Sequence, residues 1–289
     1  MSRRTPPLAP PDLDPAVVCA LQERILGWFA THRRDLPWRS TTDPYAVLVS
    51  EVMLQQTQVS RVVPKYEAFL AAYPALEDLA AAPLGDVLTR WQGLGYNNRA
   101  RRLRECAAAA VAAAADAPSP DGDVRQASLP RTLDDLRRLP GLGPYTARAV
   151  LVFAYNDDLA AVDANVRRVL THELDLDRDL SDRGLQAVAD AVLPPGRSRD
   201  WHNALMDYGA LVLTARTTGI SSRTQQGAFE GSRRWHRSRL LRALLAHGPV
   251  RESQVPALLG LDGDAAAEII AALEADGLVR RDGDTVRIA

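Results

Sequence analysis

The sequence is poor in cysteine, in lysine and in long apolar runs. Its 289 residues include only two cysteines, Cys19 and Cys106, so this chain alone can build neither a disulfide scaffold nor a four-cysteine metal site. No apolar run reaches the ~18 residues that a membrane span needs, and no signal-peptide core follows the Pro-rich start. With 46% hydrophobic and 25% charged residues, the composition is that of a globular protein, which we expect to be cytoplasmic.

The basic residues are almost all arginines, with Lys65 as the only lysine, and the formal net charge is −1. Arginines gather at 99–104, 167–168 and 233–239, whereas acidic residues crowd 173–182. Because nucleic-acid binding depends on where charges lie rather than on their sum, we interpret the arginine clusters as candidate phosphate-binding sites.

The hydropathy pattern divides the chain into four segments. Residues 1–16 are Pro-rich and predicted to be a disordered tail. Residues 17–217 show helical spacing without period-2 strands, interrupted by a polar loop from 116 to 128. Residues 218–234 lack periodicity and are predicted to be a linker. Residues 235–289 show three helical stretches and an Asp-Gly hairpin signal, the arrangement of a small winged-helix (α+β) domain or of a packing module that touches no DNA.

A Gly-rich turn interrupts the helical core at residues 139–147, which read LPGLGPYTA. Gly141, Leu142 and Gly143 can turn their backbone N–H groups one way at the start of the next helix, which makes an anion site without side-chain charge. A simple helix connection that needs glycine only for its conformation is the alternative. The flanking helices favour a helix-hairpin-helix motif of DNA-binding proteins.

Two carboxylates are candidates for chemistry. Asp43-Pro44 predicts a helix start, and the helix is expected to run to about Val59. Glu51 then lies in an apolar stretch, on nearly one face with Gln55 and Gln58. It is either on an exposed face or a buried, partnered group.

The second carboxylate is Asp163, which precedes a predicted helix. An aspartate there is an ordinary N-cap, and a capping carboxylate held rigidly can also be functional.

Four stretches together resemble the helix-hairpin-helix base-excision glycosylases, and most of all the adenine DNA glycosylase (MutY) family: EVMLQQTQ at 51–58, GLGYNNRAR at 93–101, the hairpin at 139–147 and VDANV at 162–166. The resemblance covers about 20–215. It implies an all-α, two-lobed glycosylase fold over 17–217, which binds double-stranded DNA containing a mispaired or damaged base and removes mispaired adenine, opposite G or 8-oxoguanine, after base flipping.

The resemblance also implies roles for individual residues. Glu51 matches the catalytic acid/base and Asp163 the second catalytic carboxylate, with Asn165 beside it. Gln55 and Gln56 match positions that contact the mispair, and Tyr96 matches a tyrosine that wedges near the lesion. Tyr145 stands where bifunctional relatives carry a Schiff-base lysine, so we expect a monofunctional enzyme.

Glycosidic cleavage explains why two carboxylates are needed. One should protonate the purine, which requires a pKa raised by apolar surroundings such as those of Glu51. The other should stay ionised and stabilise the oxocarbenium-like sugar. Asp163 at a helix N-terminus is expected to fill that role.

The chain departs from the family at its iron–sulfur cluster. The four ligand positions correspond to Leu213, Ile220, Arg223 and Phe229, and none is a thiol. We therefore expect no cluster and no other cofactor or metal. The β-rich domain that reads 8-oxoguanine in many relatives has no counterpart, which leaves recognition of that base open.

Other interpretations remain. Mismatch thymine glycosylases of the same superfamily share RRDLPWR at 33–39 and Tyr145, so thymine, uracil or another modified base is an alternative substrate. A non-enzymatic winged-helix DNA-binding protein is a further alternative, although it would not need both carboxylates. We expect a monomer that does not bind membranes and is associated with the nucleoid in the cytoplasm.

Overall fold

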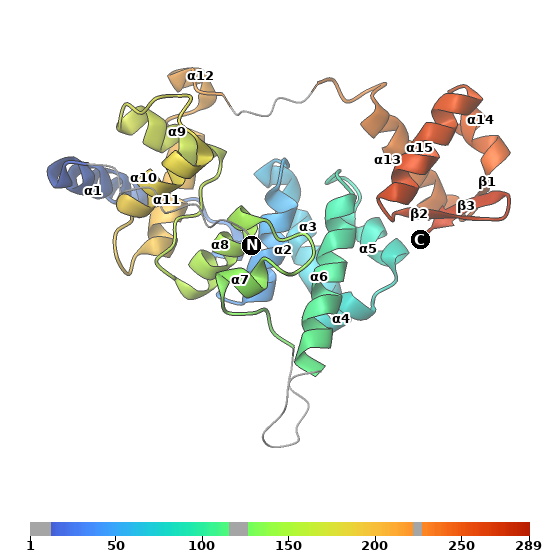
Figure 1. The fold of residues 1–289 in the computed structure, drawn as a ribbon, viewed down its shortest axis with the longest axis horizontal. Helices are drawn as coiled ribbons and strands as arrows, with labels where there is room; N and C mark the ends of the chain where they lie inside the picture. The colour runs from blue at the N-terminus through green and yellow to red at the C-terminus, as the bar shows by residue number, and fades with distance from the viewer. Residues whose placement is uncertain (1–12, 116–126, 222–226) are drawn as a thin grey trace, which may run out of the picture. The chain divides into compact units, whose positions relative to one another are not determined.

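The computed structural model describes residues 13–115, 127–221 and 227–289 (Figure 1). The chain divides into two compact units, each built from separated segments. The first unit contains residues 1–48, 131–137 and 142–224, and the second contains 49–130, 138–141 and 225–289. Helix α2 (Pro44–Leu54) begins in the first unit and ends in the second.

The first unit is helical throughout its described residues. Its elements are α1 (Pro15–His32), the 3-10 turn η1 (Pro37–Arg39), α7 (Leu133–Leu136), α8 (Pro144–Tyr155), α9 (Ala164–Glu173), α10 (Asp182–Ala191), α11 (Ser198–Leu211) and α12 (Ala215–Thr218). Helix α11 packs against α1, α8 and α9. The fully buried Ile25, Leu170 and Trp201 belong to the core that these helices share.

The second unit combines helices with a small sheet. Its elements are α3 (Val59–Ala72), α4 (Leu76–Ala81), α5 (Leu84–Trp91), α6 (Asn98–Ala115), α13 (Arg233–His247), β1 (Val250–Arg251), η2 (Glu252–Gln254), α14 (Val255–Leu259), α15 (Gly263–Ala275), β2 (Val279–Asp282) and β3 (Thr285–Ile288). Helix α6 packs on α4 and α5, around the buried Phe69, Trp91 and Leu103.

Residues 233–289, the C-terminal module, form three helices and an antiparallel sheet of order β1-β3-β2. The predicted hairpin is confirmed, with Asp282 opposite Thr285 and Gly283 at φ +62° in the turn. The sequence did not indicate β1, because two residues are too few for a period-2 pattern. The predicted fold class, helical with a small C-terminal α+β region, is confirmed.

Several predicted boundaries change. The helix expected to reach Val59 ends at Leu54, so Gln55 and Gln58 do not share a helix face with Glu51. Helix α1 begins at Pro15, because the Asp14 carboxylate accepts a hydrogen bond from the N–H of Ala16. Most of the predicted tail, most of the predicted 116–128 loop and part of the predicted linker lie outside the described residues.

The predicted absence of strands before residue 230 agrees with the described part of the chain, where every strand follows α13. Across the same residues, no helix combines the length and hydropathy that crossing a membrane would require.

Candidate active site

Asp163 is the N-cap of α9, as its position in the sequence predicted. Its Oδ1 accepts a hydrogen bond from the N–H of Val166 at 2.7 Å, and its Oδ2 accepts one from Nδ2 of Asn165 at 2.9 Å. Burial raises the pKa of Asp163 above its ordinary value, and the bonds from Val166 and Asn165 only partly offset this effect. Burial therefore opposes the ionisation of Asp163 that the helix N-terminus was expected to favour.

Arg168 holds the side chain of Asn165 in place by hydrogen bonding. Its Nη2 donates to Oδ1 of Asn165 at 2.5 Å and to the carbonyl of Gly209 at 2.7 Å, and its Nε donates to the carbonyl of Leu213 at 2.6 Å. Gly209 lies so close that a Cβ added there would stand 2.8 Å from Cβ of Asn165. This contact joins α11 to the start of α9 and fixes Asn165 beside Asp163.

His202 fixes the segment that leads into Asp163. Its Nε2 accepts the N–H of Ala161 at 2.8 Å, while Nδ1 lies 2.7 Å from the carbonyl of Ser198. These partners define a neutral imidazole with the proton on Nδ1, and burial lowers the pKa of His202 in agreement. Both ring nitrogens of His202 thus bind backbone groups of the protein.

The Gly-rich hairpin forms between α7 and α8. Gly141 has φ +81°, which glycine adopts without strain, and a Cβ there would stand 2.8 Å from Cβ of Arg102. Gly143 is the extended N-cap of α8, followed by Pro144. Leu142 is only 7% exposed, so its side chain anchors the turn and any contact with DNA falls to the backbone.

Tyr145, at the position of the Schiff-base lysine of bifunctional relatives, packs against a small cluster that includes Ala149 and Val152. The only lysine, Lys65, is in α3, and its Nζ lies 3.4 Å from the carbonyl of Arg90.

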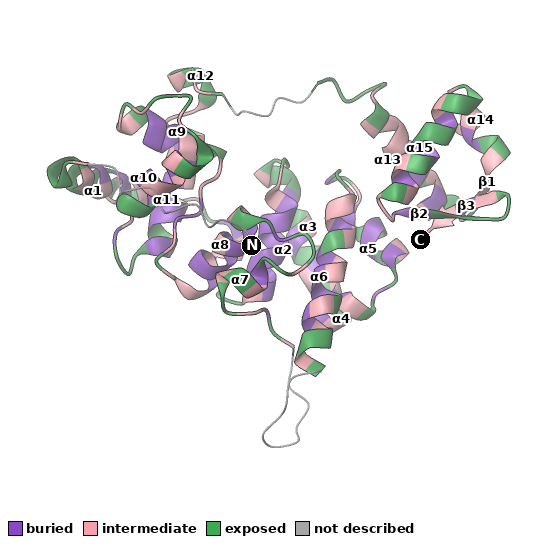
Figure 2. Cartoon of the chain, in the orientation of Figure 1, coloured by how far each residue is buried: buried purple, intermediate pink, exposed green. Residues whose placement is uncertain are grey.

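Glu51 is buried in α2, with 7% of its surface exposed, and the nearby residues Val49 and Met53 are both 0% exposed. Figure 2 shows α2 coloured mostly as buried. The alternative of an exposed helix face is therefore wrong. The predicted N-cap of this helix is confirmed, because Asp43 accepts hydrogen bonds from the N–H groups of Tyr45 and Ala46. Glu51 thus enters an apolar environment one turn before the helix ends.

The turn after α2 is shaped by Arg99 of α6. Nη1 of Arg99 donates to the carbonyls of Val52, Met53 and Gln55 at 2.6, 3.1 and 2.5 Å. These carbonyls are ones that the end of a helix leaves without an intrahelical partner. The turn carries Gln56 at φ +55°, with its side chain exposed.

The same guanidinium also holds the loop before α6. Nη2 of Arg99 donates to Oγ1 of Thr57 at 3.0 Å and to the carbonyls of Leu94 and Gly95 at 3.2 Å each. Burial lowers the pKa of Arg99 to about 10. One side chain therefore ties the Gln55-Gln56 turn to the loop that carries Tyr96, which has φ +46° and is 38% exposed.

The interpretation of the arginine clusters as phosphate sites is wrong for several members. The guanidinium groups of Arg99, Arg168 and Arg239 bind backbone carbonyls of the protein, those of Leu258 and Leu259 in the last case. Others form ion pairs: Arg101 with Glu105, Arg167 with Asp182 and Arg237 with Asp276. The sequence did not reveal that Arg99 and Arg168 hold the backbone around the candidate site residues, since a cluster does not show which way each side chain points.

The residues at the cluster positions of the family do not fit an iron–sulfur group. Leu213 is partly buried against the core of the first unit, and its carbonyl is bound by Arg168. Thr214 caps α12, the helix that continues this segment. Phe229 is 52% exposed, and Arg223 lies outside the described residues. Iron–sulfur clusters are held by cysteine thiolates, and none of these residues supplies one.

Comparison with known proteins places these features in a family. A family profile described as HhH-GPD superfamily base excision DNA repair protein matches residues 49–192. The adenine DNA glycosylase of Mycolicibacterium smegmatis is 44% identical over 197 residues, which are 67% of this chain and 63% of that protein. The chain thus spans less than two thirds of the length of this relative.

Two further relatives are covered over most of their length. The thymine/uracil-DNA glycosylase of Methanothermobacter thermautotrophicus is 31% identical over 196 residues, which are 66% of this chain and 84% of that protein. A solved thermostable thymine-DNA glycosylase superposes with a TM-score of 0.61 at 30% identity, covering 70% of this chain and 90% of the other. The chain therefore belongs to the HhH-GPD superfamily of base-excision DNA repair proteins.

Proposed function

We propose that this chain is a monofunctional DNA glycosylase that hydrolyses the N-glycosidic bond of mispaired adenine, opposite G or 8-oxoguanine, in double-stranded DNA. The observation that carries the proposal is Glu51, a carboxyl buried among apolar residues directly before the Gln55-Gln56 turn. The 44% identity to an adenine DNA glycosylase supports adenine as the base removed.

In this mechanism Glu51 is the proton donor. Breaking the bond between sugar and base expels a poor leaving group, which leaves more easily once a ring nitrogen of the purine is protonated. Burial favours the protonated form of a carboxylic acid, and Glu51 is buried in α2, where the nearby residues Val49 and Met53 are buried as well. After the base departs, the Glu51 carboxylate can accept a proton from the water that adds at C1′.

Asp163 stabilises the positive charge that develops on the sugar. Its carboxyl is held by two hydrogen bonds, so its position is defined before DNA binds. Burial raises the pKa of Asp163, and the positive charge that develops on the sugar should favour its ionised form. Tyr145 offers no amine, so the product is an abasic site without strand cleavage.

The remaining partners and boundaries are part of the same proposal. The Gly141–Gly143 turn binds a DNA phosphate through backbone N–H groups, and Gln55, Gln56 and Tyr96 contact the mispair. A core at 17–217, a linker at 218–234 and a winged-helix domain at 235–289 remain the proposed domain division. We propose that the chain acts as a monomer on DNA in the cytoplasm.

Removal of mispaired thymine or uracil is the second candidate. This candidate is supported by the share of two relatives that the chain matches. The match extends over 84% of the thymine/uracil-DNA glycosylase and 90% of the thermostable thymine-DNA glycosylase.

The experiment is single-turnover base release from duplexes that contain A:8-oxoguanine, A:G, T:G or U:G. Release from the two adenine duplexes, abolished by Glu51→Gln and by Asp163→Asn, is expected. Lys65→Ala is the control, because a monofunctional enzyme does not need its only lysine. Release from T:G or U:G alone would replace the adenine proposal with the second candidate.

A further inference from the structure

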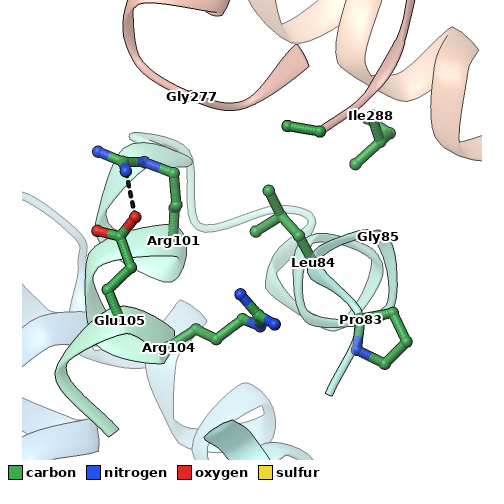
Figure 3. Close-up of a pocket in the computed structure, with 9 residues that line it drawn as sticks. Pro83, Leu84, Gly85, Arg101, Arg104, Glu105, Gly277 and Ile288 are labelled. Atoms are coloured by element: carbon green, nitrogen blue, oxygen red, sulfur yellow. Dashed lines mark hydrogen bonds and ion pairs between the residues drawn. The ribbon is translucent and has the colours of Figure 1, made fainter. Parts of the chain in front are cut away.

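The C-terminal module lies against α5 and α6 within the second unit (Figure 3). A Cβ added at Gly85 would come within 4.0 Å of Cγ2 of Ile288. Gly277, at φ +63°, backs onto Arg101, whose Nη1 would lie 3.2 Å from a Cβ there. Leu84 and Ile288 face the same cavity. The module and the helices that precede it are therefore packed parts of one unit.

The loop between α5 and α6 holds the backbone of Tyr96 without help from the module. The carbonyl of Tyr96 accepts the N–H of Arg99 at 2.9 Å. The neighbouring carbonyl of Gly95 accepts Nε1–H of Trp91 at 3.1 Å and Nη2–H of Arg99 at 3.2 Å. These bonds fix the backbone at φ +46°, so the Tyr96 side chain projects from a predetermined position.

The side chain of Tyr96 is held from a different part of the chain. Nη1 of Arg234, in the first turn of α13, donates to the Tyr96 hydroxyl at 2.8 Å. Nη2 of the same arginine donates to the carbonyl of Gly227 at 2.9 Å, which fixes the guanidinium. Carbon Cζ of Arg234 lies 6.0 Å from the centre of the Tyr96 ring, and Cζ of Arg99 lies 5.6 Å from it. The hydroxyl end is thus anchored while the ring stays 38% exposed.

We infer that Arg234 is a positioning residue for Tyr96, through which the C-terminal module takes part in opening the DNA stack at the mispair. The inference rests on the proposed function, in which Tyr96 contacts the duplex. A ring that inserts beside a base must keep its orientation against the stacking energy of the duplex. Two guanidinium groups supply that orientation, Arg99 from the core and Arg234 from the module.

Arg234→Ala is the decisive variant, because it frees the Tyr96 hydroxyl and leaves the backbone bonds of the loop in place. Arg242→Ala is its matched control, since Arg242 is exposed, carries the same charge and lies in the same helix, where its Nε is 3.4 Å from the carbonyl of Ser238. Each variant is assayed for kcat and KM on an A:G duplex. Extrusion is followed separately by the fluorescence of 2-aminopurine placed beside a 2′-fluoro-adenosine that resists cleavage.

A roughly tenfold loss of kcat and a matching loss of extrusion are expected for Arg234→Ala, as for the loss of one charge-assisted hydrogen bond. Arg242→Ala should leave both unchanged, and Arg234→Lys should recover part of each. Tyr96→Phe should equal Arg234→Ala, and combining them should cost nothing further because both remove the same bond.

Equal rates for Arg234→Ala and Arg242→Ala, or losses that multiply in the double variant, would overturn the inference. Undocking the module by Ile288→Asp provides an independent check, because it should lower extrusion as Arg234→Ala does while Tyr96 and Arg234 are both retained. A wild-type chain that releases no base from any mispair contradicts the proposed function. A wild-type chain that does, together with an equally fast Arg234→Ala variant, contradicts only the role of Arg234.

Discussion

Gly209→Ala tests whether the contact between α9 and α11 positions Asp163. A new Cβ at residue 209 would stand 2.8 Å from Cβ, 3.1 Å from the carbonyl oxygen and 3.2 Å from Cα of Asn165. These atoms belong to the backbone or are bonded to it, so no rotamer change relieves the clash and one helix must move. Overpacking of this kind lowers the free energy of unfolding by about 1–3 kcal/mol. The higher helix propensity of alanine than of glycine offsets about 0.5–1 kcal/mol of this loss.

The expected result is a net loss of about 1–2 kcal/mol in the free energy of unfolding together with a fall in kcat of at least about tenfold, since displacement of a catalytic group by a fraction of an ångström slows chemistry strongly. Denaturant unfolding measures the first quantity, and single-turnover base release measures the second. Gly27→Ala in α1 is the matched control, because a Cβ at this helical glycine would meet nothing within 4 Å and should stabilise the chain. If Gly209→Ala stabilised the protein as Gly27→Ala does, the packing argument would be refuted.

Three further predictions concern charge. Asn165→Ala removes a hydrogen bond that favours ionised Asp163, so the acid limb of the kcat/KM profile should move to higher pH; an unmoved midpoint contradicts this role. Asp207, whose carboxyl is 0% exposed, binds Arg39 through both oxygens, so Asp207→Ala should lower the free energy of unfolding by about 3–5 kcal/mol, and a loss below about 1 kcal/mol in denaturant unfolding would refute it. Although burial alone would raise it, the pKa of Asp207 lies below its ordinary value because hydrogen bonds, led by that from Arg39, outweigh burial. The stabilisation should thus be complete above about pH 4 and lost as the pH falls further, with Asp207→Asn abolishing that pH dependence. Arg99→Lys leaves three donors where the guanidinium makes six hydrogen bonds, and should cost about 2–4 kcal/mol in the same unfolding measurement; an unchanged midpoint would show that the bonds to the loop carbonyls are replaceable.

Local signals in the sequence correctly predicted the starts of α2 and α9 and the C-terminal hairpin. Asp43 before Pro44 and Asp163 before α9 both cap helices through their own carboxylates, a contact that spans two or three residues. The Asp-Gly pair at 282–283 likewise makes its turn from neighbouring residues. Such features need no knowledge of the rest of the fold.

Features that depend on distant residues could not be predicted in this way. Gln55, Gln56 and Thr57 are compatible with a helix, and α2 ends before them where Arg99 binds its last carbonyls from 44 residues away. The pKa of Asp163 depends on burial that only the folded chain creates, so its direction was mispredicted. The burial of the Leu142 side chain, which is 7% exposed, likewise depends on the folded chain and has no local signal.

The segmented order of the two units has a consequence during synthesis. Helix α1 packs on α11, yet Leu211 is added about 180 residues after His32. At about 5–20 residues per second, the apolar side of α1 waits roughly 10–40 s for its partner on a translating ribosome. Residues 49–130 can meanwhile begin to fold, because the helices α3 to α6 pack against one another. Helix α1 is therefore made long before its partner α11, and a chaperone that shields amphipathic segments would act on α1 in that interval.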